Sequence, residues 1–221
     1  MISSYLTQIG TASSDMEWIG KLQQRKKANG KCKQQTSKGH NVIYIVSGYK
    51  RSGTSLMMKI LDHLGLELDY DVKFSCDVIK NGNFKQKYVF EIKEIVYGQP
   101  FELEKFEGKV IKVLASGVLS SQNNSKNIKM IYMSRDKNEI LNSMRKYKNE
   151  SDMKREKNII SRIPKNKIFK VFNPLEVNFI DLINAPKEII MDVIDYLDLK
   201  PTTLQIECAI SEVNPEMNHF S

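Results

Sequence analysis

The apolar residues of this chain fall into short runs separated by polar and small residues. Residues 42–47 are mostly β-branched or aromatic, which is typical of a buried strand, and small residues dominate the turn at 48–55. The apolar positions that follow have helical spacing; they are Leu56, Met57, Ile60 and Leu61. The pattern therefore predicts a strand, a loop and a helix in succession.

The same alternation recurs along the chain. Strands are predicted at residues 110–114, 128–135 and 175–179, the first of them a central parallel strand, and a short edge strand is predicted at 66–70. Helices are predicted at residues 88–97, after Asp136, within the charged stretch 150–170 and at 186–197. Strands that alternate with helices predict an α/β fold, with a central, mostly parallel sheet flanked by helices.

The loop after the first strand is the first candidate site. Gly48, Gly53 and the hydroxyl of Ser55 fit the spacing of the Walker A phosphate loop, but Thr54 stands where that loop has its lysine. The basic group has moved to Arg51. Backbone N–H groups of such a loop still form a cradle for a dianionic group, so we predict an oxyanion site without ordinary ATP use. A plain glycine turn is the alternative, but it does not require this order of residues.

A second candidate site follows the strand predicted at 128–135. Arg135 ends this strand, and Asp136 with Glu139 forms an acidic variant of the capping box that starts a helix. Ser143 lies in the same helix. An arginine fork and a hydroxyl at this point form a suitable phosphate grip, because open α/β sheets bind ligands at the carboxyl ends of their strands.

Both segments resemble those of sulfotransferases that use 3′-phosphoadenosine 5′-phosphosulfate (PAPS). The order Gly-Tyr-Lys-Arg-Ser-Gly-Thr-Ser at 48–55 is similar to their 5′-phosphosulfate loop, and Arg135 with Ser143 is similar to their 3′-phosphate segment. Lys137 replaces the proline that is usual in the second segment. The resemblance covers about residues 41–220. It is closest to short bacterial-type sulfotransferases, whose motifs have counterparts here in Tyr88, Glu91 and Lys112.

The resemblance implies a three-layer P-loop-type fold and a transferase that moves a sulfuryl group from PAPS to a hydroxyl or amine. The product of the donor would be adenosine 3′,5′-bisphosphate (PAP). The residues implied to bind the nucleotide are Lys50, Arg51, Ser52, Gly53, Thr54, Ser55, Arg135 and Ser143. The acceptor would be a small molecule or a carbohydrate. Contacts to the adenine are unassigned, and no metal site is expected.

Catalysis would require charge stabilisation and a base. Arg51 would hold the leaving 5′-phosphate as an electrostatic clamp, since an arginine does not deprotonate. The candidates for the base are Glu91, Glu94, His63 and Asp77. We favour Glu91, with a structural glutamate on a solvated helix as the alternative. His63 has a second interpretation as a partner of the helix dipole.

Two other functions are weighed against sulfuryl transfer. A kinase of a small molecule or nucleotide on the same fold would require the Walker lysine, and Thr54 argues against it. A non-catalytic protein that binds PAP or another nucleotide would keep both phosphate segments. Binding of PAP, with ATP as the control, separates a sulfotransferase from a kinase.

The charge of the chain is concentrated at its N-terminus. The formal net charge is +8, and residues 1–40 contribute +5 of it. We expect residues 1–40 to form a basic, partly flexible arm and residues 41–221 to form one sulfotransferase-like domain. The arm has no interleaved aromatic residues, so nucleic acid binding is not expected.

The cysteines and the hydropathy of the chain indicate its cellular compartment. Cys32, Cys76 and Cys208 are far apart and fit no metal-ligand spacing, so we expect reduced thiols in a cytoplasmic protein. No apolar run approaches the roughly 18 to 20 residues that a membrane-spanning helix needs.

Overall fold

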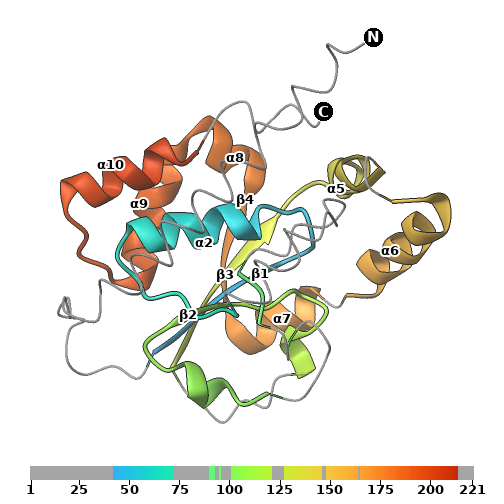
Figure 1. Cartoon of the computed structure of the whole chain (residues 1–221), viewed down its shortest axis with the longest axis horizontal. Coiled ribbons are helices and arrows are strands. Elements are labelled where there is room, and N and C mark those ends of the chain that lie inside the picture. The colour runs from blue at the N-terminus through green and yellow to red at the C-terminus, as the bar shows by residue number, and fades with distance from the viewer. Residues whose placement is uncertain are drawn as a thin grey trace.

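The sheet consists of four parallel strands in the order β2-β1-β3-β4. The strands are β1 (Ile43–Gly48), β2 (Val110–Lys112), β3 (Ile128–Ser134) and β4 (Leu175–Asn178). The computed structural model describes residues 42–71, 90–92, 95, 101–120, 127–145, 148–163 and 165–213. Helices cover both faces of the sheet (Figure 1), so the predicted three-layer α/β fold is confirmed.

The strands contribute to two cores because successive side chains of a strand point to opposite faces. Val46 packs into the larger core, whose helices are α2 (Thr54–His63), α8 (Phe179–Asn184), α9 (Pro186–Leu197) and α10 (Thr203–Ser211). Ile43 and Ile45 pack on the other face. That face is covered by α7 (Lys165–Phe172) and the short 3-10 helices η2 (Leu103–Phe106) and η3 (Val118–Ser120).

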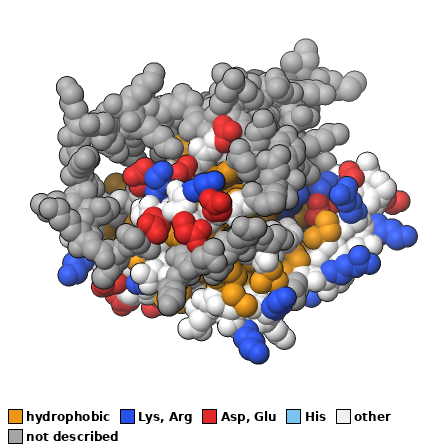
Figure 2. Space-filling view, turned by 90° about the horizontal axis from the view of Figure 1, so that it is seen from below, with side chains coloured by type: hydrophobic (Ala, Val, Ile, Leu, Met, Phe, Trp, Pro, Cys, Tyr) orange, Lys and Arg blue, Asp and Glu red, His pale blue; other side chains and the backbone are white. Residues whose placement is uncertain are grey.

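A third, smaller core joins α5 (Lys137–Arg145) to α6 (Glu150–Arg162). Its buried members are Ile140 and Met144 from α5 and Met153 and Ile160 from α6. These two helices lie together to the right of the sheet in Figure 1. Figure 2 shows the molecule from below, the side on which α7 lies in Figure 1, with apolar side chains between charged ones of both signs. In the described part of the chain, no helix is both long enough and apolar enough to cross a membrane.

The strand at 110–112 corrects one prediction. It is parallel, as predicted, but it is an edge member of the four-stranded sheet and not a central strand. Leu68 forms one parallel bridge with Val110 on the outer side of β2, so the predicted edge strand at 66–70 is reduced to that bridge. Residues 110–113 are buried, since β1 lies on one side of β2 and the segment with Leu68 on the other. This burial gives an edge strand the composition of a central one.

The helix predicted at 88–97 is wrong for the three residues described at 90–92. None of them is helical, and Phe90 has a φ of 61°, outside the range of a right-handed helix. Phe90 packs against Tyr70 in the larger core, whereas Ile92 lies in the core on the other face of the sheet. The spacing of these apolar residues therefore reflects a segment that supplies both cores. Ile95 is helical.

The charged stretch at 150–170 forms two helices, α6 and α7. Ile163, which lies between them, has an extended conformation. Pro164 follows it in the sequence, and the residue before a proline is disfavoured in the helical region. The predicted helix from Pro186 to Leu197 is confirmed as α9.

Candidate functional site

The two candidate segments lie beside each other at the carboxyl edge of the sheet. β1 and β3 are neighbours, and Gly48 at the end of β1 is in register with Met133 near the end of β3. The loop that follows β1 and Arg135, which follows β3, therefore leave the sheet at the same edge. β2 lies on one side of β1 and β3 on the other. The carboxyl ends of β1 and β3 therefore flank the topological switch point, where open α/β sheets bind ligands.

The loop requires glycine at both of its glycine positions. Gly48 has a φ of 148°, and a Cβ there would lie 2.5 Å from the carbonyl oxygen of Met133. Gly53 has a φ of 96°, and a Cβ there would lie 2.5 Å from a ring carbon of Phe179. Arg51 also has a positive φ, 70°, which costs a non-glycine residue about 1 to 3 kcal/mol. The surrounding structure therefore holds the loop in a strained shape, a property common at ligand sites.

Helix α2 starts directly from this loop, and its first turn is suited to an anion. Gly53 is its N-cap and makes no side-chain cap hydrogen bond, and no acidic residue lies in the first turn. In contrast, Asn149 caps α6 and Thr202 caps α10 with their side chains. The N–H groups at the start of α2 and the positive end of its dipole thus face the loop without a side-chain acceptor at the cap.

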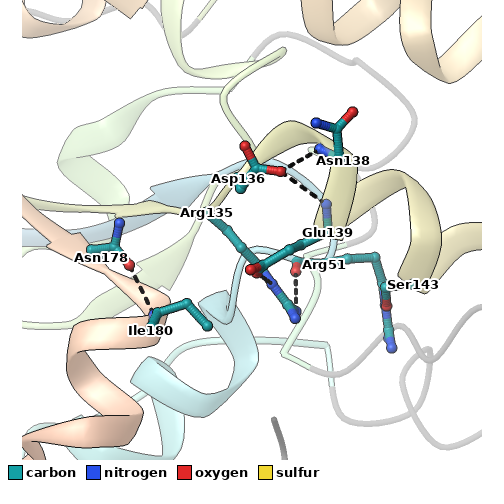
Figure 3. Close-up of polar contacts among 8 residues, drawn as sticks. All are labelled: Arg51, Arg135, Asp136, Asn138, Glu139, Ser143, Asn178 and Ile180. Atoms are coloured by element: carbon teal, nitrogen blue, oxygen red, sulfur yellow. Dashed lines mark hydrogen bonds and ion pairs between the residues drawn. The ribbon is translucent and has the colours of Figure 1, made fainter. Parts of the chain in front are cut away.

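The loop and the second segment are in direct contact (Figure 3). The Nε of Arg51 donates a hydrogen bond to the Oγ of Ser143 over 3.0 Å. An Nη of Arg135 donates to the backbone carbonyl of Arg51 over 3.3 Å. Ser143 is buried, whereas Arg51 is exposed. The structure therefore brings together Arg51, Arg135 and Ser143, which the sequence placed in two separate motifs.

Arg135 is held by its own helix as well. Its Nε lies 2.9 Å from Oε2 of Glu139, one turn further on in α5. Asp136 accepts hydrogen bonds from the backbone N–H groups of Asn138 and Glu139, as predicted for the start of this helix. In a capping box the side chain of Glu139 would also accept from the backbone N–H of Asp136. Here the Glu139 carboxylate forms an ion pair with Arg135 instead.

Glu91, the favoured base, forms a buried ion pair that reaches the loop. Its Oε1 lies 2.7 Å from Nζ of Lys112 in β2, and both side chains are almost fully buried. The same ammonium lies 3.3 Å from Oγ of Ser55 in the first turn of α2. One lysine therefore connects the candidate base with the candidate phosphate cradle. Lys112 was indicated only by the family resemblance, although a lysine within a β-branched run is itself a signal of a buried charge with a function.

The other predicted loop residues have different surroundings. Ser52 is fully buried and its hydroxyl donates to the carbonyl of Tyr49, so it shapes the loop. Thr54 is buried at the start of α2. The ammonium of Lys50 lies 3.9 Å from the carboxylate of Glu156 in α6, which also pairs with Lys148 over 2.6 Å.

Among the described groups with shifted pKa values are Tyr132 in β3 and Glu212, which follows α10. Burial raises the pKa of Tyr132, whose ring meets that of Tyr49 edge to face at 6.5 Å. Burial also acts to raise the pKa of Glu212, but hydrogen bonds from His63 and Lys59 outweigh it and hold the pKa below its usual range. His63 is thus the partner of Glu212 at the far end of α2 from the loop. Its position excludes the role of base at the loop; Glu94 and Asp77 lie outside the described residues.

A family model described as a sulfotransferase domain matches residues 43–214. The chain belongs to this sulfotransferase family. The family predicted from the sequence is therefore confirmed. No curated protein sequence matches the chain.

Solved structures are similar at low sequence identity. The sulfotransferase STF9 from Mycobacterium avium has a TM-score of 0.50 and 8% identity, with 78% of this chain and 68% of that one covered. The sulfotransferase domain of the Synechococcus PCC 7002 olefin synthase has a TM-score of 0.49 and 14% identity, with 85% and 86% covered. A retinol dehydratase solved with androsterone and PAP has a TM-score of 0.48 and 16% identity. This sulfotransferase covers 66% of the dehydratase's length, with 80% of its own residues aligned.

Proposed function

We propose that this sulfotransferase binds PAPS across the carboxyl ends of β1 and β3, with one grip for each phosphate position. The residues of the 5′-phosphosulfate grip would be Lys50, Arg51, Ser52, Gly53, Thr54 and Ser55. The 3′-phosphate grip would be Arg135 and Ser143. The observation that carries this proposal is the contact between the two grips, in which Arg51 bonds Ser143 and Arg135 bonds the Arg51 carbonyl. A ligand with phosphates at both positions would meet one connected set of donors.

The residues present fit such a ligand. The loop at 48–53 leaves the first turn of α2 without a side-chain cap, and a dianion would accept from its N–H groups. Arg51 is exposed and joined to the second grip, so its charge lies between the two phosphate positions. When bound, PAPS would supply the sulfuryl group and a phosphate leaving group. In this proposal Arg51 stabilises the charge that develops on that phosphate.

Glu91 is the base in this proposal. The ammonium of Lys112 fixes its carboxylate next to Ser55, and the strained backbone of Phe90 precedes it in the chain. The Lys112 ammonium lies between the Glu91 carboxylate and the loop. In this position the carboxylate would accept the proton of the acceptor's hydroxyl or amine. Lys112 would orient Glu91 and add positive charge beside the 5′-phosphate position.

The acceptor in this proposal is a small molecule or a carbohydrate with a hydroxyl or an amine. The protein would act in the cytoplasm, as its three separated cysteines led us to expect. Residues 41–221 would form the catalytic unit, with the basic arm outside it.

Thermal unfolding with two nucleotides tests the proposal. PAP should raise the melting temperature, whereas ATP, which has no 3′-phosphate, should raise it far less. A ligand that binds only the folded chain stabilises it by about 2.7 kcal/mol at a hundredfold excess over Kd. Release of PAP from PAPS, measured with and without the Arg51→Ala substitution, then separates an enzyme from a nucleotide-binding protein. Equal shifts with PAP and ATP would contradict the proposed site.

A further inference from the structure

The ring of Phe179 lies against the guanidinium of Arg135. The Cζ of Arg135 is 4.3 Å from the centroid of the ring, a distance at which a cation and an aromatic face attract each other. Both side chains are only 5% exposed, so water weakens this attraction little. Sheet register explains the contact. Ser134 pairs with Asn178 at the ends of β3 and β4, and Arg135 and Phe179 directly follow these two strands.

The same ring also contacts the phosphate loop. A Cβ on Gly53 would lie 2.5 Å from Cδ2 and 3.1 Å from Cε2 of Phe179, so the ring packs directly on the loop backbone where α2 begins. Asn178 caps α8 by accepting from the N–H of Ile180, which fixes the backbone that carries the ring (Figure 3). Phe179 is therefore a rigid support that touches both proposed grips.

Three contacts together fix the plane of the Arg135 guanidinium. The guanidinium carbon lies over the ring of Phe179, the Glu139 carboxylate accepts from Nε, and the Arg51 carbonyl accepts from an Nη. A guanidinium has five N–H donors, and these hydrogen bonds use two of them. Within the described part of the chain, the three remaining donors are on the Nη edge. A phosphate would therefore meet this edge, and not the side of the guanidinium on which Phe179 packs.

We propose that Phe179 is a positioning residue for recognition of the 3′-phosphate. The ring sets the orientation of Arg135 relative to the loop, so that the Nη edge is directed at the 3′-phosphate when the 5′ group is in the loop. This inference rests on the proposed function, because it assumes that Arg135 meets the 3′-phosphate. It adds that selectivity for a 3′-phosphorylated nucleotide depends on the aromatic side chain that packs against Arg135.

The test compares two nucleotides that differ only in the 3′-phosphate. Affinities of PAP and adenosine 5′-monophosphate are measured by calorimetry, or by competition for the weaker ligand, in the full chain and in Phe179→Leu. The leucine keeps much of the buried apolar volume but has no aromatic face. We expect PAP affinity to fall about tenfold, which corresponds to an energy between those of an exposed and a desolvated cation–π contact, and adenosine 5′-monophosphate affinity to stay within about twofold. Phe172→Leu, a buried phenylalanine of α7 in the other core, is the matched control and should leave the ratio unchanged.

Further variants keep the result decisive. Phe179→Met serves the same purpose if the leucine variant does not fold, since methionine adapts to irregular spaces. In an Arg135→Ala background, Phe179→Leu should cause no further change in the ratio of the two affinities. An unchanged ratio in both single variants, or an equal loss for both nucleotides, overturns the inference and leaves Phe179 a packing residue. A wild-type chain that does not prefer PAP would instead overturn the proposed function.

Discussion

The guanidinium of Arg51 and the hydroxyl of Ser143 form a 3.0 Å hydrogen bond between residues that are 92 positions apart in the sequence. Arg51 lies in the strained loop after β1, and Ser143 is buried in α5, two turns beyond the end of β3. The bond exists because β1 and β3 are neighbours in the sheet. It makes the side chain of Arg51 dependent on the 3′-phosphate segment, so the two grips should not be energetically independent.

Replacing Ser143 tests this dependence. Ser143→Ala removes a hydroxyl that Arg51 uses now and that the 3′-phosphate would use in the complex. Loss of a hydrogen bond of this kind costs about 1 kcal/mol, so we expect PAP affinity to fall several-fold and turnover to fall as well. Calorimetry with PAP and an assay of sulfuryl transfer or PAPS hydrolysis measure the two effects. Asn142→Ala, its exposed neighbour in α5, is the control and should change neither.

The two arginines should have separable roles. Arg135 would touch the 3′-phosphate, which is the same in the ground and transition states, so Arg135→Ala should mainly weaken binding of PAPS and PAP alike. Arg51 would face the phosphate that gains charge, so Arg51→Ala should lower turnover by about 10² to 10³ and PAP affinity by less. Normal turnover in Arg51→Ala, or normal PAP binding with no turnover in Arg135→Ala, would show that this assignment is wrong.

The buried Glu91 should be required for turnover but not for binding of PAP. Glu91→Gln keeps the shape of the side chain and removes the proton acceptor, so turnover should fall by about 10² to 10⁴ with PAP affinity nearly unchanged. The melting temperature must be measured in parallel, because the substitution also leaves the buried Lys112 without its charged partner. Glu102→Gln, an exposed glutamate paired with Lys105, is the control. Retained turnover in a folded Glu91→Gln protein would assign Glu91 a structural role.

Residues 1–38 should be dispensable. The segment holds few apolar residues and much of the net positive charge, so its removal should leave the fold and PAP binding intact. The melting temperature and PAP affinity of the truncated chain check this. Precipitation of the truncated chain, or loss of PAP binding, would mean that Trp18 and its neighbours pack on the domain.

The ion pair of Glu212 predicts a pH dependence of stability. Its carboxylate lies 2.8 Å from Nζ of Lys59 and 3.3 Å from Nε2 of His63, and its pKa in the folded chain is below the ordinary value of 4.5. A lowered pKa adds stability that is present above pH 4.5 and is lost as the pH falls through the folded pKa. Glu212→Gln should therefore be less stable than the wild type by about 1 kcal/mol at pH 7.

The measurement is urea unfolding of both proteins between pH 2 and 7. The difference between them should shrink toward zero at the acidic end, because the wild-type carboxylate is then protonated. Glu207→Gln, an exposed position on α10, should show no such difference. A Glu212→Gln difference that does not change with pH would indicate a packing effect and not a charge effect.

The sequence by itself determined the elements whose signals are local. The strand, loop and helix at 43–63 and the start of α5 at Asp136 depend on β-branched residues, on glycines at positive φ and on a capping carboxylate. Each of these acts within a few residues, so pattern alone placed them. The order of Lys50 to Ser55 and the spacing of Arg135 and Ser143 also indicated the family before any contact was known.

The tertiary structure decided which of these residues meet. Arg51 reaches Ser143, and Phe179 reaches Arg135, only because β1, β3 and β4 are adjacent in the sheet. The order of the strands depends on how the helices pack on the two faces of the sheet. This packing joins distant segments, so no local sequence pattern predicts it. The segment at 90–92 shows the same limit. Its apolar spacing resembled a helix, yet the chain there serves two cores and places Glu91 on Lys112, a pairing fixed by packing between distant segments.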